Sequence, residues 1–549
     1  MFSDMAAVLR RGRRWLPAIG ASTLVGTLVT LALPAVLGRA LDAAVSAGDG
    51  ITAADATGWV ATAGLLIALG LATDLLDTVL VAGCVADAAA WLRRRLVEHV
   101  LAIGPRGAGR FATGDIVGRI SGNAADAARA GPGLATAVAA VAPPVGGLVL
   151  LAVIDLGVAA AFLAGLVLSG LVLRAFTRRT ADAIGPYLVV QGRIAARLAE
   201  SLAGSRTIAA AGTLDREVRR VLEPLPELRA EGERAWRVLS RSGAQAAVVG
   251  PLVLLAVLAA GGYALSAGRI TPGELFAAGQ YAALGAGLGG LTGVFGRLVR
   301  ARAGLRRTGE VLGVPAVEYG RRDLPPGPGR LEFRGAVVTD RLEHVDLVVP
   351  GGACVAVVGR SGAGKSTLVA LAARLRDPDG GAVLLDGVPV TDLTRDALRE
   401  AVGCAFERPV LVGGTVADAI GLGLDAGSVR AAARATRADE FIARLPDGYD
   451  TPLAETPLSG GEAQRLGLAR AWPAGRVLLL DDATSALDMV TEMTVDRALR
   501  DGRTRMVVTH RAAVAARADL VAWLDGGRLR GVGRHRDLWT EPAYRELFA

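Results

Sequence analysis

Hydrophobic and polar residues are distributed unevenly along this chain of 549 residues. Long uncharged runs fill about the first three hundred residues and are absent afterwards. A helix needs about 20 apolar residues to cross the hydrocarbon core of a bilayer. The pattern therefore predicts a soluble half that follows six membrane spans, at residues 15–38, 56–73, 130–154, 156–173, 242–268 and 275–296.

Arginine residues are concentrated at the ends of the apolar runs that would lie on one side of the membrane. This asymmetry predicts the orientation of the spans. Cytoplasmic loops are enriched in basic residues, so we expect a multi-pass protein of the plasma membrane with both termini in the cytoplasm. The connections 86–130 and 174–241 are too long for turns, which predicts helices that continue into the cytosol. The arginines are Arg10, Arg11, Arg13, Arg14, Arg93, Arg94, Arg95, Arg174, Arg178, Arg179, Arg297, Arg300 and Arg302, and the opposite ends carry Asp42, Asp49, Asp55, Asp155 and Glu274.

The composition agrees with a membrane protein and argues against two other classes. The chain is 52% hydrophobic, and its mean hydropathy is +0.41. A net charge of +8 would suit nucleic acid, but much of the arginine lies beside the apolar runs, so we expect a lipid bilayer and no nucleic acid as partner. Cys84, Cys354 and Cys404 form no CxxC pair, so neither a disulfide framework nor a zinc site is expected.

Two acidic residues, Asp74 and Asp77, interrupt the second apolar run, which continues past them to about residue 85. An ionisable side chain at membrane depth is costly and usually faces a cavity or a partner. Either these carboxylates bind cargo, or they are structural and lie near the inner end of the span, in water or paired with arginine. We favour the structural interpretation.

Residues 313–330, "GVPAVEYGRRDLPPGPGR", are rich in Pro, Gly and charge, which is typical of a linker. We therefore predict a transmembrane domain at 1–304 with two long cytoplasmic loops, a linker at 305–330 and a second domain at 331–549.

The second domain opens with a phosphate-binding pattern. The apolar stretch "ACVAVVG" at 353–359 predicts a buried strand, and "GRSGAGKST" at 359–367 then leads into an apolar helical run. This is GxxxxGK[ST] in its strand–loop–helix setting, where backbone N–H groups ring a phosphate and the Ser hydroxyl binds Mg²⁺. The pattern predicts a bound phosphate group and Mg²⁺, held by Gly359, Ser361, Gly362, Ala363, Gly364, Lys365, Ser366 and Thr367.

Lys365 is the only lysine in the chain. Lysine and arginine together number 61 residues, and all the others are arginine. An ammonium is a compact charge that fits between two phosphates, whereas a guanidinium is a wide planar fork. We interpret the composition as a drift toward arginine that spared the one position where arginine fails.

Two further segments contain candidate functional residues. In "VLLLDDATSALD" at 477–488, four apolar residues predict a central strand, and Asp481 at its end can reach the magnesium ion. Between this strand and the phosphate motif lies "LSGGEAQRLGLARA" at 458–471, and "VVTH" follows, ending at His510.

In this order, the segments resemble the ABC transporter family, specifically its exporter-fold half-transporters, and the resemblance covers essentially the whole chain. It implies an α-helical six-span transmembrane domain followed by an α/β P-loop NTPase (ABC) domain. It also implies a second half-transporter as partner, with ATP clamped between the phosphate loop of one half and the signature of the other. The signature positions are Ser459, Gly460, Gly461 and Glu462, and His510 matches the histidine that contacts the γ-phosphate.

The sequence departs from the family pattern around the phosphates. The usual catalytic glutamate is Asp482, the glutamine near magnesium is Glu407, and the signature glutamine is Glu462. No aromatic residue stands near Asp340, where the family stacks one on adenine. Aspartate is shorter than glutamate by one methylene, about 1.5 Å of bond length. We therefore expect a weakened site, with Asp482 and His510 as catalytic residues and Ser366, Glu407 and Asp481 at the metal.

These features predict ATP-driven export of a lipophilic small molecule, a lipid or a peptide by a dimeric transporter. A weakened site beside an intact signature favours one subunit of a heterodimer, and a homodimer with two slow sites is the alternative. An exporter-fold importer and a non-transporting regulatory subunit also remain open. The six apolar runs argue against a soluble ATPase that acts on nucleic acid or ribosomes.

Overall fold

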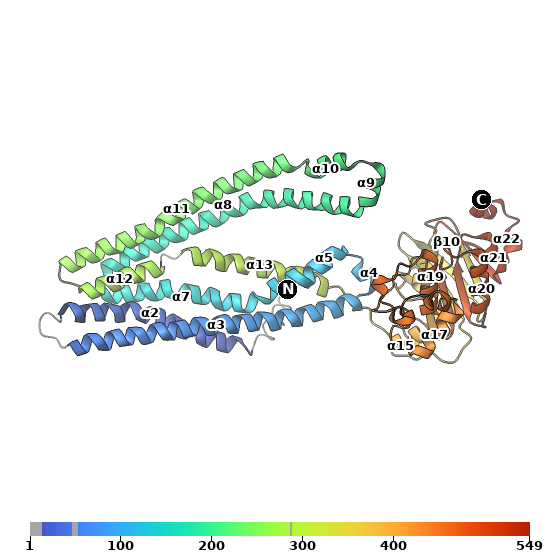
Figure 1. The fold of residues 1–549 in the computed structure, drawn as a ribbon, viewed down its shortest axis with the longest axis horizontal. Coiled ribbons are helices and arrows are strands. Elements are labelled where there is room, and N and C mark those ends of the chain that lie inside the picture. Colours follow the sequence, from blue (N-terminus) through green and yellow to red (C-terminus); the bar gives the residue numbers. More distant parts are fainter. Residues whose placement is uncertain (1–13, 47–52, 286–287) are drawn as a thin grey trace. The chain divides into compact units, whose positions relative to one another are not determined.

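The structure of the chain, a computed structural model, describes residues 14–46, 53–285 and 288–549. It forms two compact units (Figure 1). The first contains the residues up to Val100 together with Phe111–Val314, and the second contains Leu101–Arg110 and Pro315–Ala549. Helix α13 continues to Leu312, into the range predicted as a linker. The domain limits at 304 and 331 stay a prediction.

Every regular element in the described part of the first unit is a helix. Alanine and leucine are strong helix formers, and a backbone in lipid must satisfy its own hydrogen bonds. The two long connections are indeed helical, as predicted. The elements are α2 (Leu16–Ser46), α3 (Ala53–Ala102), α5 (Thr113–Gly118), the π-helical turn η2 (Arg119–Asn123), α6 (Ala124–Ala128), α7 (Ala130–Ile154), α8 (Leu156–Ala203), α9 (Ser205–Ala211), α10 (Leu214–Leu222), α11 (Leu225–Ser266), α12 (Pro272–Gly285) and α13 (Leu288–Leu312).

Within the described residues, five helical segments are long and apolar enough to cross a membrane. They overlap the first five predicted runs, and they are Leu16–Val45, Thr57–Ala102, Thr113–Ile154, Leu156–Ala203 and Leu214–Ser266. The sixth predicted run, 275–296, crosses residues 286 and 287, which lie outside the described residues. Helix α12 ends just before this point and α13 begins just after it, so the sixth span remains a prediction.

Hydrogen bonds tie the helices together at one end of the bundle. Asp155 is the single residue between α7 and α8. Its carboxylate accepts hydrogen bonds from the first N–H groups of α8 and pairs with Arg269 Nη1 at 2.7 Å. Asp42, near the end of α2, accepts from Thr271 Oγ1 and Gly273 N, each at 2.7 Å. Helices α9 and α10 lie at the opposite end of the bundle (Figure 1).

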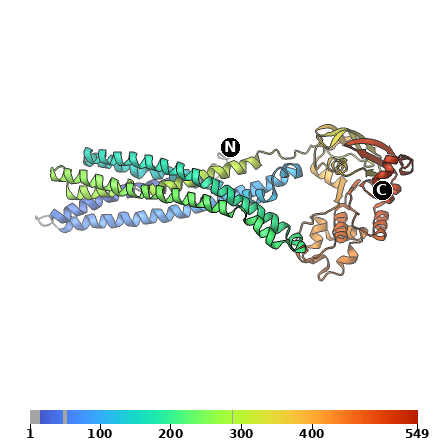
Figure 2. The same ribbon diagram turned by 90° about the horizontal axis from the view of Figure 1, so that it is seen from above.

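The core of the first unit lies where α7, α8, α11 and α12 meet. Helices α8 and α11 pack side by side along much of their length (Figures 1 and 2). Phe162, Val257 and Tyr281 are buried there with less than 2% of their surface exposed. The hydroxyl of Tyr281 donates to the carbonyl of Leu31 at 2.8 Å, so it also fastens α12 to α2.

The second unit contains two sheets. The larger has the strand order β10-β9-β3-β8-β7-β6, in which only β10 is antiparallel to its neighbour. The smaller is antiparallel with the order β2-β1-β4-β5. The strands are β1 (Leu331–Val338), β2 (Leu342–Val349), β3 (Cys354–Val358), β4 (Gly380–Leu385), β5 (Val388–Pro389), β6 (Val402–Phe406), β7 (Val477–Asp481), β8 (Thr504–Val508), β9 (Leu520–Asp525) and β10 (Arg528–Gly533).

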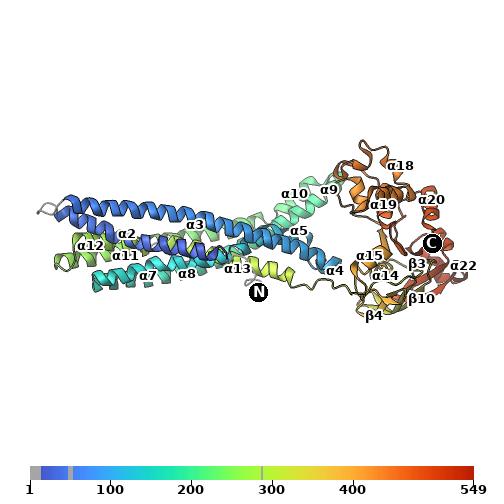
Figure 3. The same ribbon diagram turned by 90° about the horizontal axis from the view of Figure 1, so that it is seen from below.

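The helices of the second unit divide into those packed on the sheets and a separate helical part. Helices α16 to α19 have their own buried cluster around Phe441, Ile442 and Leu466. Figure 3 shows α18 and α19 apart from α14 and β3. The bounds are α4 (Gly104–Ala108), α14 (Lys365–Ala372), α15 (Arg395–Ala401), α16 (Val416–Gly421), α17 (Ala426–Ala435), α18 (Asp439–Ile442), η3 (Gly448–Asp450), η4 (Leu453–Glu455), α19 (Gly460–Ala471), α20 (Met489–Leu499), α21 (Ala512–Arg517), α22 (His535–Leu538), α23 (Pro542–Arg545) and η5 (Glu546–Phe548).

The predicted central strands are present, and both lie in the buried middle of the larger sheet. Every residue of β3 is buried, as are the four apolar residues of β7. Since β3, β8, β7 and β6 are parallel, their carboxyl ends meet at one edge of the sheet. This edge places Gly359, Glu407, Asp481 and His510 at the ends of neighbouring strands, where ligands bind in open α/β sheets.

Candidate functional site

The loop between β3 and α14 has the backbone of a phosphate cradle. Gly362 and Gly364 have φ angles of 83° and 100°, which favour glycine. A Cβ at Gly364 would lie 2.5 Å from the side chain of Leu342 and 2.9 Å from the carbonyl oxygen of Arg341. Any side chain at Gly364 would therefore clash with its neighbours, and the start of α14 that follows carries the partial positive charge of a helix end.

Lys365 is held inside this loop by backbone oxygens. Its Nζ donates to Gly359 O at 2.9 Å and to Arg360 O at 3.0 Å. Burial lowers the pKa of Lys365, and the charges of Asp482 and Asp481 act in the opposite direction. The ammonium is thus a concentrated positive charge at the centre of the loop, where a phosphate would neutralise its desolvated charge.

Ser366 and Asp481 meet at the sheet edge, as their predicted shared role requires. The Ser366 hydroxyl donates to Asp481 Oδ1 at 3.1 Å. Burial raises the pKa of Asp481, and the Ser366 hydrogen bond lowers it. The described residues contain no group of three or more His, Cys, Asp or Glu side chains that could hold a metal ion by themselves. Mg²⁺ instead binds through one or two protein oxygens, waters and the substrate's phosphates, so this pair fits magnesium bound together with a nucleotide.

Glu407 is nearby but is not brought into this pair. It follows the last residue of β6, Phe406, which lies opposite Asp481 in the sheet. Within the described ranges no hydrogen bond joins its carboxylate to Ser366 or Asp481, and its side chain is 57% exposed with Arg408 at 4.0 Å. Its negative charge contributes to the raised pKa of Asp481. The predicted metal trio is therefore a contacting pair, Ser366 and Asp481, with a third carboxylate at the rim.

Asp482 faces His510. Its Oδ2 lies 3.4 Å from His510 Nε2, and its backbone has a φ of 49°, in the left-handed region. Burial raises the pKa of Asp482, the charge of His510 lowers it, and the charge of Asp481 raises it again. A carboxylate and an imidazole in contact at the end of β7 are groups that can orient and deprotonate a water.

The signature serine caps the helix that follows it. The N–H of Glu462 donates to Ser459 Oγ at 3.3 Å, and Glu462 Oε2 accepts from Ser459 N at 2.9 Å and from Ser459 Oγ at 2.8 Å. This capping box satisfies the N–H groups of Ser459 and Glu462 at the start of α19. The backbone hydrogen bond from Ser459 lowers the pKa of Glu462. Glu462 therefore stabilises the start of α19 through its hydrogen bonds with Ser459 and carries a negative charge there.

The phosphate loop and the signature, which the family resemblance assigns to one shared nucleotide site, are not in contact through polar groups among the described residues of this chain. Among residues 14–46, 53–285 and 288–549, no hydrogen bond or ion pair connects Ser459–Glu462 with the loop Gly359–Thr367. Gly460 and Gly461 lie instead against Ala486, in the loop after β7, with added Cβ atoms at 3.6 Å and 3.1 Å from its nearest atoms.

Gln464 is a site residue that the sequence prediction missed. Its side chain is buried and connects three segments. Its Nε2 donates to Glu407 O at 2.8 Å and to Ser485 Oγ at 2.9 Å, and its Oε1 accepts from Ala486 N at 2.9 Å. Gln464 thus links the signature helix to both loops that flank the nucleotide edge. The only signal in the sequence is its place two residues after Glu462.

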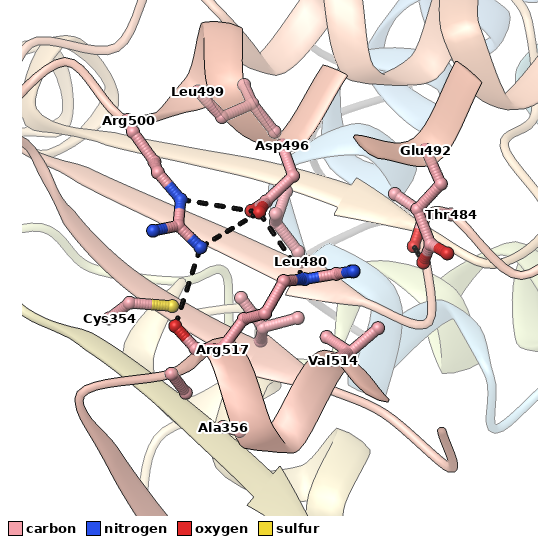
Figure 4. Close-up of a pocket in the computed structure, with 12 residues that line it drawn as sticks. Cys354, Ala356, Leu480, Thr484, Glu492, Asp496, Leu499, Arg500, Val514 and Arg517 are labelled. Carbon is pink, nitrogen blue, oxygen red and sulfur yellow. Dashed lines mark hydrogen bonds and ion pairs between the residues drawn. The ribbon is translucent and has the colours of Figure 1, made fainter. Parts of the chain in front are cut away.

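A second polar cluster stiffens the elements around β7 (Figure 4). Asp496 on α20 accepts from Arg500 at 3.0 Å and from Arg505 at 3.1 Å, and Arg517 Nε lies 3.7 Å away. The adjoining cavity, which Cys354 lines, holds about 30 Å³. That volume accommodates water but no nucleotide, so the cluster is structural.

Comparisons with known proteins agree with this geometry. Family models described as "ABC transporter transmembrane region" and "ABC transporter" match residues 16–285 and 342–485. The ABC transporter ATP-binding protein RamA of Streptomyces coelicolor is 47% identical over 538 residues, which cover 96% of this chain and 84% of that protein. The multidrug efflux ATP-binding/permease protein Rv0194 of Mycobacterium tuberculosis is 36% identical over 64% of this chain, a stretch that covers 31% of that longer relative.

A solved structure extends the similarity to the whole fold. It is described as a bacterial Atm1-family ABC exporter with ATP bound, and it matches with a TM-score of 0.81 at 27% identity over 98% of both chains. The chain therefore belongs to the ABC transporter family, as a multi-pass exporter-fold half-transporter whose ATPase drives export and which dimerises with another half-transporter.

Proposed function

We propose that this chain is the weakened-site subunit of a heterodimeric exporter. It binds Mg-ATP at its own phosphate loop, hydrolyses it slowly, and completes the competent site of its partner with its signature. The cargo is an amphipathic molecule, and the transporter moves it out across the plasma membrane. The single observation that carries the proposal is the placement of Asp482.

Asp482 has a short side chain at a position from which the general base must reach the attacking water. Its carboxylate is held 3.4 Å from His510. A general base must lie within hydrogen-bond distance of the attacking water, and a misplacement of about 1 Å can cost on the order of 10²-fold in rate. The exposed Glu407 is a second departure from the family pattern at the same edge of the sheet. Its carboxylate repels the phosphates that Ser366 and Asp481 help to hold.

The signature supports a partner with a stronger site. Ser459 and Glu462 form a complete capping box, and between them Gly460 is exposed and Gly461 half-buried. The N-terminus of α19 can therefore present N–H groups to the terminal phosphate of a nucleotide bound by another chain. In a homodimer, this intact surface would face only slow sites, which makes the heterodimer the better fit.

At the chain's own site, Lys365 and the N–H groups of the loop bind the β- and γ-phosphates. Ser366 and Asp481 would hold Mg²⁺, which when bound neutralises charge that develops on the phosphates. His510 lies beside the terminal phosphate, and Asp482 takes up the proton of the attacking water. Gln464 couples this edge to the signature helix through Glu407 and Ser485.

Export itself is tested in everted membrane vesicles from cells that produce the chain with its co-purifying partner. The vesicles are supplied with a lipid-soluble extract of the host, and the accumulated compounds are identified by mass spectrometry. We expect at least one amphipathic compound to accumulate only with Mg-ATP, because the nucleotide site then faces the added ATP. Vesicles with Lys365→Ala serve as the matched control and should accumulate none.

Three outcomes of this assay would contradict the proposal. ATP-dependent loss of a compound from the vesicles would indicate an importer. ATP hydrolysis without movement of any compound would indicate a regulatory subunit. Purification of only this chain, without a second half-transporter, would indicate a homodimer.

The proposed topology predicts which ends of the helices are reached from outside the cell. Leu156→Cys and Ser266→Cys lie on exposed positions at the end of the bundle that carries Asp155, and Ser205→Cys lies on α9 at the opposite end. In a background without the native cysteines, a membrane-impermeant thiol reagent should label the first two in intact cells. Ser205→Cys should label only after the cells are opened. The reverse pattern would overturn the cytoplasmic placement of both termini.

A further inference from the structure

A groove on the first unit contains an isolated acidic side chain. It lies between α2, α3 and α12 and has a volume of about 360 Å³, which falls within the range of small-molecule sites. Its walls are apolar apart from Thr30, Asp74 and Gln280, one polar side chain from each helix. Two of the three helices, α2 and α12, are fastened to each other beside the groove, since Tyr281, next to Gln280, donates to the carbonyl of Leu31.

The Asp74 carboxylate has no partner in the described part of the chain, where no hydrogen bond or ion pair to it is found. Two other acidic residues of the same helix differ. Asp77, three residues further on, accepts from Thr23 Oγ1 at 3.1 Å, and Asp87 pairs with Arg14 at 2.9 Å. Asp74 lies in the segment Thr57–Ala102, and its exposed neighbours Leu71 and Leu75 are apolar. An unpaired carboxylate in such surroundings is costly unless a cation binds it.

A second acceptor in the groove comes from a proline in α2. Pro34 has no N–H, so the carbonyl of Thr30 lacks the donor that an α-helix would otherwise supply. The Thr30 hydroxyl is already occupied, because it donates to Gly26 O at 2.8 Å. The groove thus combines a carboxylate, a freed carbonyl and the carbonyl end of the Gln280 amide, all of which accept hydrogen bonds.

We propose that this groove binds the cationic head of the cargo, an ammonium or guanidinium group on an apolar body. Asp74 neutralises the charge, Thr30 O and Gln280 accept its N–H groups, and the leucine-rich walls cover the apolar part. An anionic lipid head is repelled by Asp74, and a divalent metal would lack further charged ligands. The inference rests on the proposed export function, because it names the cargo class, but binding can be measured without transport.

The test uses the transporter purified from its host membrane and placed in lipid nanodiscs. Dansylcadaverine joins an apolar fluorophore to a primary ammonium, and its N-acetyl derivative keeps the same body without the charge. Binding is followed by fluorescence anisotropy, with empty nanodiscs subtracted. We expect the amine to bind about tenfold tighter or more than the N-acetyl derivative, which corresponds to about 1.4 kcal/mol. Asp74→Asn should abolish this preference, and Asp74→Glu should keep most of it.

Asp77→Asn is the matched control, since it removes the same charge from the same helix outside the groove lining. Its preference for the amine should equal that of the wild type. An unchanged preference in Asp74→Asn, or an equal loss in Asp77→Asn, would overturn the assignment. If Asp74→Asn does not fold, dicyclohexylcarbodiimide labelling of the wild type replaces it. Dansylcadaverine should protect Asp74 from the reagent, whereas equal protection by the N-acetyl derivative would contradict the proposal.

The two proposals fail separately. Selective binding of the amine without ATP-dependent accumulation in everted vesicles would count against export and leave the groove assignment intact. Accumulation of the amine that is the same in wild type and Asp74→Asn would count against the groove and leave export intact.

Discussion

Gly460→Asp will remove about nine-tenths or more of the ATPase activity of the transporter purified from its host, whereas Asp482→Asn will leave most of it. Gly460 is exposed, and an added Cβ would lie 3.6 Å from the nearest side chain, so the variant can fold. Its new carboxylate would face the terminal phosphate bound by the partner and repel it; a loss of about tenfold corresponds to about 1.4 kcal/mol of barrier. In the proposed heterodimer, Asp482 serves only the chain's own slow site.

Two controls sharpen this comparison. Gly460→Ala adds a methyl group at an ordinary contact distance without charge, so it should keep most of the activity. Asp482→Glu extends the base by one methylene, and it should raise the turnover of the isolated chain by about tenfold. If Asp482→Asn is as damaging as Gly460→Asp, the chain's own site is a working one, and the proposed weakened-site heterodimer is wrong.

Lys365→Arg will lose nucleotide affinity nearly as completely as Lys365→Ala, by at least about tenfold. The Nζ atom lies within 3.0 Å of two carbonyl oxygens of the loop, and the side chain is buried. A planar guanidinium is too wide for this space and carries its donors in a fixed fork. Affinity is measured by titration with a fluorescent ATP analogue.

The neighbouring Arg360 provides the opposite exchange as a control. Its side chain is exposed and pairs with Glu546 at 3.4 Å, so Arg360→Lys should bind the analogue within about twofold of the wild type. Affinity of Lys365→Arg within about threefold of the wild type would disprove the steric argument. It would also remove the explanation for the single lysine of the chain.

The capping box of Glu462 changes how one departure from the family pattern is understood. From sequence, Glu462 is a substitution in the signature. In the structure it satisfies Ser459 N and Ser459 Oγ, so the geometry of the helix start is kept and only the charge differs. This supports a signature that still functions, and it separates Glu462 from Asp482, where the change shortens the side chain.

Much of this protein is determined by residues that are close in sequence. The apolar run before Gly359 is strand β3, the following glycines form the loop, and Lys365 starts α14, because each depends on local backbone preferences and burial. The first five predicted spans are helices for the same reason, and Asp155 is the single residue that separates α7 from α8. The family signature could likewise be recognised because its residues follow one another along the chain.

Only the tertiary structure decided which distant residues meet. Gln464 contacts Ser485 across 21 positions and Glu407 across 57, and no pattern near Gln464 indicates either partner. Sequence also grouped Glu407 with Ser366 and Asp481, whereas the fold leaves it exposed at the rim. Asp74 and Asp77 are equivalent in sequence, yet Asp77 is hydrogen-bonded, whereas Asp74 lies in a groove and has no partner among the described residues. Such differences depend on how helices and strands pack against each other, and local sequence does not encode that packing in a readable form.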